Sequence, residues 1–317
     1  MGILVEGAWV VDDAKYRNAA SGEFVRPDST FRDWITPDGS GRFAPEAGRY
    51  HLLVAANCPW AHRTVIARRL KGLEQIIDVS FASGPNSEHG WPFEDGVDGG
   101  PQPADGELRL HQVYTAADPG FTGRVTVPTL WDRRHRTIVN NESADLVRIF
   151  DRSFGALSNQ VVDLRPGRLE PTIDALNEWI YADINNGVYR CGFATTQAAY
   201  EAACRRLFAA LDRAEGLLGG QRYLAGDVLT EADVRLFPTL VRFDAVYHGL
   251  FKCNLRRLAD YPSLTDYVGR LWPVAGFGDT CDIEAFKRGY YLGIRRLNPS
   301  GIVPLGPEVG PRQTAGG

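Results

Sequence analysis

The segment that most constrains the fold is a cysteine placed between an apolar run and a helical pattern. Residues 50–56 read Tyr-His-Leu-Leu-Val-Ala-Ala, a short apolar run that predicts a buried strand. Residues 65–70 have the spacing and composition of a helix. Cys58 stands at the junction, and Pro59 follows it. Proline suits the first turn of a helix because its missing N–H leaves no bond unmade.

A cysteine in this position is favoured to be reactive. The backbone N–H groups at a helix N-terminus, and the positive end of the helix dipole, stabilise a thiolate relative to a thiol. His62 and Arg63 lie in the next turn and can add to this effect. The alternative is a buried cysteine that acts as a small apolar residue. The strand–Cys-Pro–helix context favours the first interpretation.

The second thiol of a Cys-x-x-Cys motif is absent, because position 61 is alanine. A mixed disulfide on Cys58 must therefore be resolved by another thiol, most simply a small one from solution. The sequence thus predicts a thiol-transfer enzyme that works with an external thiol, and not a dithiol oxidoreductase.

The 317 residues are enough for two domains and a sizeable core. The net charge of −4 indicates neither nucleic-acid binding nor attraction to an anionic membrane. We expect no membrane segment, since no apolar run of about 18 residues and no signal-peptide pattern occurs. The cysteines show neither metal-ligand spacing nor a disulfide scaffold, which predicts no metal and a reducing cytoplasm. They are Cys58, Cys191, Cys204, Cys253 and Cys281.

Residues 1–49 are polar and irregular but contain spaced aromatic residues. We expect an ordered arm that wraps the following domain and is held by these rings, with disorder as the alternative. The rings are Trp9, Phe24, Phe31 and Trp34.

Residues 76–81 predict a second strand, and residues 82–109 a long loop, which is usually functional or disordered. Trp91 and Phe93 in this loop either fill the core or line a site for a flat apolar group. The bare sequence leaves these two alternatives open.

Residues 125–131 predict an alternating strand broken by Pro128. Residues 136–139 predict its hairpin partner, and Asn140 to Ser143 open a helix over residues 144–150. Together with the segments from residue 50 onward, this is the order of a thioredoxin-like domain, predicted to span 50–151. In that fold the Val127–Pro128 bond is expected to be cis, opposite Cys58.

Residues 152–168 predict a linker, after which helical patterns dominate. We predict an all-helical domain over 169–295 and a C-terminal extension over 296–317. Thr230 and Asp233 have the spacing of a capping box, which is a structural role and not a catalytic one.

A thioredoxin-like domain followed by an all-helical domain is the glutathione-transferase architecture. Within it, the chain resembles the glutathionyl-hydroquinone reductases, the Xi class of that superfamily. The resemblance begins with Cys-Pro-Trp-Ala-His-Arg-Thr and spans nearly the whole chain. The matching stretches are 58–64, 90–91, 122–128, 138–143, 185–189, 236–237, 241–244, 246–249, 251–256, 290–291 and 298–307.

The resemblance implies a nucleophile, Cys58, and glutathione as co-substrate. It further implies reduction of glutathionyl-hydroquinones through a mixed disulfide, a proton donor at Tyr189, and a homodimer. Tyr247 and Tyr290 match tyrosines that support the thiolate. The glutathione-binding positions would be Trp91, Arg124, Val125, Thr126, Val127, Glu142 and Ser143. For each tyrosine, the alternative is a buried ring whose hydroxyl is satisfied locally.

The chain departs from the family pattern near Tyr290 and Tyr291, where the usual flanking histidines are absent. The preferred quinol or thiol can differ accordingly. Two other functions stay open. One is an omega-type or glutaredoxin-like thiol transferase, or a dehydroascorbate reductase. The other is a non-catalytic interaction protein of the same fold.

Overall fold

The computed structural model describes residues 2–11, 19–97, 100–101, 108–159 and 162–310. Parts of the predicted arm, long loop, linker and C-terminal extension lie outside these ranges. The chain divides into two units. The first contains Met1–Arg17, Arg26–Asp163 and Arg288–Gly293, and the second contains Asn18–Val25, Leu164–Lys287 and Ile294–Gly317. The domain boundaries predicted from the sequence remain predictions.

A four-stranded mixed sheet is the centre of the first unit, in the order β4-β3-β8-β9. β3 is parallel to β4 and antiparallel to β8, which pairs antiparallel with β9. All five residues of β3 are buried, as expected for the apolar run before Cys58. The strands are β3 (Tyr50–Val54), β4 (Ile77–Phe81), β8 (Thr129–Asp132) and β9 (Thr137–Asn140).

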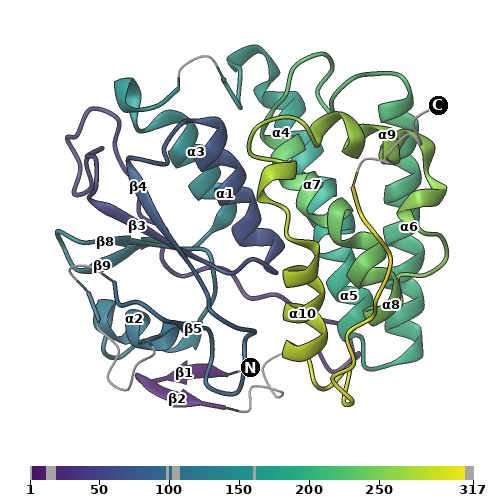
Figure 1. Cartoon of the computed structure of the whole chain (residues 1–317), viewed down its shortest axis with the longest axis horizontal. Helices are drawn as coiled ribbons and strands as arrows, with labels where there is room; N and C mark the ends of the chain where they lie inside the picture. Colours follow the sequence, from purple (N-terminus) through teal and green to yellow (C-terminus); the bar gives the residue numbers. More distant parts are fainter. Residues whose placement is uncertain (1, 12–18, 98–99, 102–107, 160–161, 311–317) are drawn as a thin grey trace. The chain divides into compact units, whose positions relative to one another are not determined.

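Helices cover both faces of this sheet (Figure 1). α1 (Pro59–Leu70) packs against α3 (Ser143–Arg152) on one face, and α2 (Leu110–Ala117) contacts β9 on the other. A buried ion pair adds to the pairing of β3 and β8. Arg49, just before β3, donates two hydrogen bonds of 2.8 Å to the carboxylate of Asp132.

The predictions for this unit differ from the structure in two places. No element was predicted for the residues of helix α2, although Leu110, Val113, Tyr114 and Ala117 have helical spacing. The strand predicted over 125–131 is shorter, since only residues from Thr129 join the ladder of β8. Pro128 has no N–H to donate to a ladder, which is why the strand begins after it.

The N-terminal arm contains more regular structure than predicted. β1 (Ile3–Val5) pairs with β2 (Ala8–Val10) and with β7 (Gly123–Arg124). A two-stranded ribbon of β5 (Pro92–Phe93) and β6 (Leu108–Arg109) precedes α2. Phe24 is buried, whereas Trp34 is 44% exposed.

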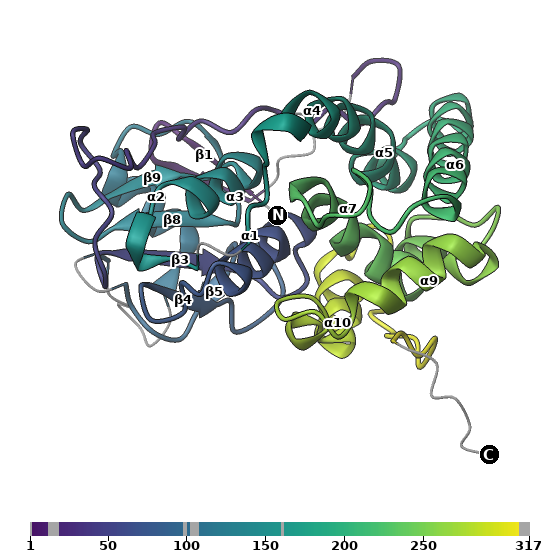
Figure 2. The same cartoon turned by 90° about the horizontal axis from the view of Figure 1, so that it is seen from above.

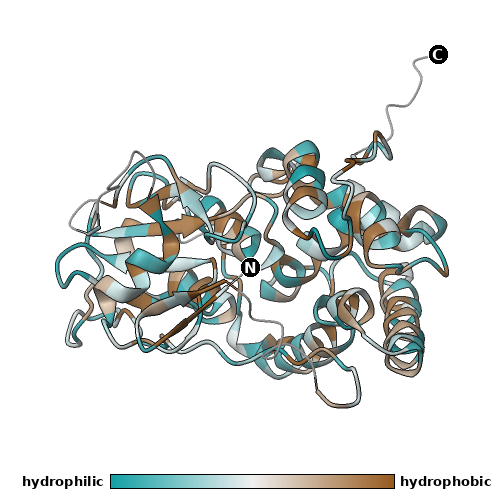
Figure 3. Cartoon of the chain, turned by 90° about the horizontal axis from the view of Figure 1, so that it is seen from below, coloured by the Kyte–Doolittle hydropathy of each residue, from teal (hydrophilic) through white to brown (hydrophobic). Residues whose placement is uncertain are grey.

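The second unit is helical (Figure 2). Every residue of α7 is buried, so this helix is the core of the unit. Its capping box is confirmed, because the Asp233 carboxylate accepts the backbone N–H of Thr230 at 2.8 Å. The other helices show alternating hydrophobic and hydrophilic segments in Figure 3, as amphipathic helices around a core do. The helices are α4 (Glu170–Trp179), α5 (Gly187–Phe193), α6 (Gln197–Gly219), α7 (Glu231–Arg242), α8 (His248–Leu250) and α9 (Pro262–Leu271).

Two π-helical turns interrupt this unit. One, η4 (Ile180–Asn185), leads into α5, and the other, η5 (Phe243–Tyr247), leads into α8. π-helical turns are rare in proteins, and those that occur often lie at functional sites. The last helix, α10 (Ile283–Gly293), contributes residues to both units.

Candidate active site

Cys58 is the N-cap of α1, at the end of the segment that follows β3. Its backbone is extended (φ −77°, ψ 116°), and its carbonyl accepts the N–H of His62 at 3.0 Å. The thiol is half-buried and forms no disulfide. The predicted strand–cysteine–helix junction is therefore confirmed, and the sulfur lies at the N-terminal end of a twelve-residue helix.

The Val127–Pro128 peptide is cis, as predicted, and lies beside the cysteine. The Cys58 thiol donates to the carbonyl oxygen of Val127 at 3.5 Å. Residues 125–128 therefore run past the sulfur outside the ladder of the sheet. An extended peptide that pairs with this segment would lie beside Cys58.

Tyr114 holds this segment in place from α2. Its hydroxyl donates to the carbonyl of Thr126 at 2.9 Å and accepts the N–H of the same residue at 3.2 Å. The side-chain amide of Asn141 donates to the same hydroxyl at 2.9 Å. Both main-chain groups of Thr126 thus already have partners within the protein.

Tyr114 was not identified from the sequence, since no element was predicted between the loop that ends at residue 109 and the strand that begins at residue 125. The helical spacing of residues 110–117 would have identified the helix. Its role at residue 126 could not be read from spacing, because the contact joins distant parts of the chain.

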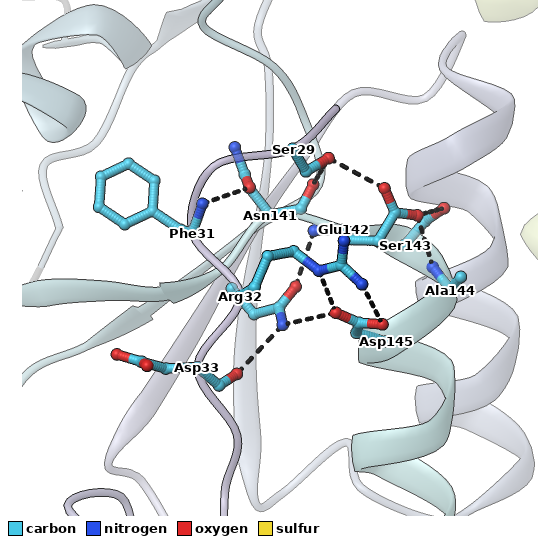
Figure 4. Close-up of polar contacts among 10 residues, drawn as sticks. Ser29, Phe31, Arg32, Asp33, Asn141, Glu142, Ser143, Ala144 and Asp145 are labelled. Carbon is cyan, nitrogen blue, oxygen red and sulfur yellow. Dashed lines mark hydrogen bonds and ion pairs between the residues drawn. The ribbon is translucent and has the colours of Figure 1, made fainter. Parts of the chain in front are cut away.

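The N-terminus of α3 forms the polar part of the candidate site (Figure 4). Glu142 is the N-cap, and its carboxylate accepts the N–H of Ala144 at 3.0 Å. Ser143 is the first residue of the helix, and its hydroxyl accepts a hydrogen bond from the Arg63 guanidinium at 3.4 Å. Arg63 is 1% exposed and stacks on the ring of Trp60.

This arrangement offers complementary charges to a small zwitterion. A helix N-terminus supported by a buried guanidinium attracts a carboxylate. The adjacent Glu142 carboxylate attracts an ammonium group. Arg63 was considered for its effect on Cys58, but its contact with Ser143 was not expected from the sequence.

The two aromatic residues of the long loop differ in their surroundings. Phe93 is 1% exposed and belongs to the core, which favours the core-filling alternative for that residue. Trp91 is 8% exposed, and its carbonyl accepts the N–H of Leu110 at 3.0 Å. Arg124 and Val125 lie at and after β7, where Arg124 pairs with Ile3 of the N-terminal strand.

Tyr290 lies on the part of α10 that belongs to the first unit and is 4% exposed. The preceding residue, Gly289, is directly against Asn57. A Cβ at position 289 would come within 2.4 Å of the Asn57 side chain. Glycine therefore permits α10 to pack against the residue that precedes Cys58.

Tyr189 and Tyr247 belong to the second unit, where they form part of one aromatic cluster. Tyr189, on α5, is half-buried, whereas Tyr247 at the end of η5 is fully buried. The ring centroids of these two residues are 6.2 Å apart. The Tyr189 ring also lies 5.5 Å from Phe251 and 6.1 Å from Phe193.

None of the five cysteines forms a disulfide. Among the described residues, no group of three or more His, Cys, Asp or Glu side chains is arranged to hold a metal ion. Within the same residues, no helix combines the length and apolar character needed to cross a membrane.

Family models match both parts of the chain. The N-terminal domain of glutathione S-transferases matches residues 57–153, and the C-terminal domain matches residues 197–270. These matches and the solved structures below confirm the predicted glutathione-transferase fold.

Three curated relatives are similar over most of their length. The glutathionyl-hydroquinone reductase PcpF of Sphingobium chlorophenolicum is 49% identical over 97% of this chain and 96% of its own. The glutathionyl-hydroquinone reductase YqjG of Escherichia coli is 45% identical over 97% of this chain and 95% of its own. The glutathione S-transferase omega-like 2 of Schizosaccharomyces pombe is 44% identical over 92% of this chain and 95% of its own.

Two solved structures superimpose over nearly the whole chain. A Xi class transferase from Natrialba magadii has a TM-score of 0.88 at 41% identity, with 98% of this chain and 94% of that chain covered. The glutathione-bound structure of YqjG has a TM-score of 0.85 at 42% identity, with 97% of this chain and 96% of that chain covered.

Proposed function

Because the chain belongs to the glutathionyl-hydroquinone reductases, the Xi class of the glutathione transferases, we propose that it reduces glutathionyl-hydroquinones to hydroquinones with glutathione. The observation that carries the proposal is the Cys58 thiol at the N-terminus of α1, 3.5 Å from the carbonyl of cis-linked Val127. A serine or tyrosine at this place would activate glutathione for conjugation. A cysteine instead forms a disulfide with it.

The proposed glutathione site extends from Cys58 to the N-terminus of α3. The backbone of Val127 pairs with the cysteinyl part of the peptide in strand fashion. Glu142 takes the γ-glutamyl ammonium. Ser143, the helix N-terminus and Arg63 hold the γ-glutamyl carboxylate. Trp91 and residues 124–126 form the surrounding wall, with Thr126 held through Tyr114.

In the first step, the Cys58 thiolate attacks the sulfur of the glutathionyl-hydroquinone. An S–S bond forms, and the bond between sulfur and the ring carbon of the keto tautomer breaks. Tyr189 supplies the proton that the ring carbon receives when this tautomer forms, and the electron pair of the broken bond moves through the ring to the carbonyl oxygen, which takes a proton from solvent as hydroquinone leaves. Tyr247 and Tyr290 support the thiolate.

In the second step, the thiolate of a second glutathione attacks the glutathione sulfur of the mixed disulfide. Oxidised glutathione leaves, and Cys58 returns as a thiolate. Ala61 fits this scheme, since the helix offers no second thiol at that position. We further propose that the enzyme works in the cytoplasm as a homodimer and needs no metal.

A second candidate is a general thiol transferase of the omega type. It is favoured by the relatives named omega-like and by the missing histidines around Tyr290. The two functions are separated when release of hydroquinone and reduction of dehydroascorbate are measured on one preparation. A reductase of the proposed kind is faster on the glutathionyl-hydroquinone.

The deciding experiment uses Cys58→Ala. We expect loss of hydroquinone release with glutathione binding largely retained, because the peptide is held by Glu142, Ser143 and Val127 and not by the sulfur. Mass spectrometry of the unmodified protein after reaction with a glutathionyl-hydroquinone should find one glutathione on Cys58. Substantial turnover by Cys58→Ala would contradict the mechanism.

A further inference from the structure

A segment of the N-terminal arm, Ser29–Asp33, runs along the edge strand β9 and the start of α3 (Figure 4). The N–H of Asp33 donates to the carbonyl of Val139, and the N–H of Asn141 donates to the carbonyl of Phe31, both at 3.0 Å. The arm therefore extends the sheet beside the residues that lead into the helix.

Two side chains of this segment reach the acidic residues at the start of α3. The Ser29 hydroxyl donates to Oε2 of Glu142 at 2.9 Å. The Arg32 guanidinium forms a two-point ion pair with Asp145, in which Nη2 lies 2.9 Å from Oδ1 and Nε donates to Oδ2. The Asp145 side chain is only 11% exposed.

The contact of Ser29 fixes the orientation of the Glu142 carboxylate. Oε1 is occupied by the N–H of Ala144, and Oε2 by the Ser29 hydroxyl. Both oxygens are held, so the carboxylate cannot turn away from the helix end. Since the Ser29 proton is used toward Glu142, the lone pairs of its oxygen remain to accept from an ammonium group.

The contact of Arg32 balances an unfavourable charge. Asp145 lies in the first turn of α3, where its carboxylate would repel another carboxylate bound at the same N-terminus. Arg32 neutralises Asp145, and the Asn140 side chain donates to the same carboxylate at 3.2 Å. The ion pair raises the pKa of Arg32, with the hydrogen bond to Asp145 as the main cause.

We infer that Ser29 and Arg32 are positioning residues that make the site selective for thiols carrying a γ-glutamyl group. Ser29 orients the carboxylate that takes the ammonium, and Arg32 removes the charge that would oppose the carboxylate. This inference rests on the proposed glutathione site but not on the quinone chemistry.

The test is calorimetric titration with S-methylglutathione and with S-methylcysteinylglycine, which lacks the γ-glutamyl group. Ser29→Ala and Arg32→Met should each weaken S-methylglutathione binding on the order of tenfold, as expected for one hydrogen bond to a charged group. Binding of S-methylcysteinylglycine should change less than about twofold, because it makes no contact there.

Two matched controls come from the same arm. Ser40→Ala removes a hydroxyl that bonds only Asp38 among its described side-chain partners, and Arg42→Met removes an exposed guanidinium 4.0 Å from Asp33. Neither should change the affinity. Arg32→Met combined with Asp145→Asn should recover most of the lost affinity, since no uncompensated charge then remains.

Equal losses for both ligands, or no recovery in the double variant, would overturn the inference. Thermal melting of each variant identifies a general loss of fold, and Arg32→Lys, which keeps the charge, should retain more affinity than Arg32→Met. The titrations use no quinone. Selective binding without hydroquinone release would therefore count against the proposed reaction and leave this inference standing.

Discussion

Tyr189 is interpreted either as a proton donor or as a ring that only packs, and the two roles predict different effects of a variant. Its ring packs against Phe193 and Phe251, which a purely structural role would also produce. It is half-buried, whereas its neighbour Tyr247 is fully buried. Packing alone depends on the ring, while proton donation depends on the hydroxyl, so a variant that removes only the hydroxyl separates the two.

We predict that Tyr189→Phe lowers hydroquinone release on the order of 10²-fold, the low end of general acid catalysis. Reduction of a simple glutathione mixed disulfide should suffer less, because its leaving group is a thiolate that needs little protonation. The measurement is the ratio of the two activities in the variant and in the unmodified protein.

Tyr247→Phe and Tyr290→Phe serve as controls for Tyr189→Phe. Both should lower the two activities together, since these residues are proposed to support the thiolate common to both reactions. Equal losses on both substrates in Tyr189→Phe would remove its assignment as the acid.

The sequence predicted single residues well where a local rule applied. Cys58 as an N-cap followed by proline, and the capping box at Thr230, are local patterns and are confirmed. Tyr114 and the ion pair of Arg32 with Asp145 were not predicted. Each joins positions far apart in the chain, so no spacing rule identifies the partners.

Helix α10 lies against the residue that precedes the candidate nucleophile. Its backbone lies against Asn57 at Gly289, where an added Cβ would approach within 2.4 Å. Glycine within a helix normally costs stability relative to alanine. Here the contact requires it, because a side chain would push the helix away from the residue before Cys58.

We predict that Gly289→Ala destabilises the protein by about 1–3 kcal/mol, as overpacking does, and slows thiol exchange at Cys58. The control is Gly216→Ala on α6, where an added Cβ meets nothing within 4 Å. That change should stabilise by about 0.5–1 kcal/mol, the usual helix preference for alanine. Denaturant unfolding measures both, and a stabilised Gly289→Ala would contradict the packing argument.

Element prediction failed where regular structure depends on pairing partners. β1 (Ile-Leu-Val) and β2 (Ala-Trp-Val) are apolar and three residues long, so a strand signal was present, but each is too short to predict a strand firmly by itself. They pair with each other, and β1 also pairs with β7 far along the chain. In contrast, β3, α1 and α7 have long or strongly apolar patterns, and the structure confirms them.

Considered as a whole molecule, the chain contains one cysteine at the candidate site and four others in different surroundings. Cys191, Cys204 and Cys253 are buried. Burial raises the pKa of the Cys204 and Cys253 thiols above their ordinary value. Burial also raises the pKa of Cys281 to about 12, and its thiol donates to the carbonyl of Phe277 at 3.3 Å.

These surroundings predict that glutathione disulfide modifies Cys58 alone. The nucleophile in disulfide exchange is the thiolate, and a thiol whose pKa is raised stays protonated at pH 8. Peptide mass spectrometry after a short exposure to glutathione disulfide should find one adduct, on Cys58, and Cys58→Ser should show none. As the pH rises toward the raised pKa of Cys281, adducts on that residue should increase while the protein remains folded. Rapid modification of Cys204 or Cys253 at pH 8 would show that the helical unit opens far more readily than its burial indicates.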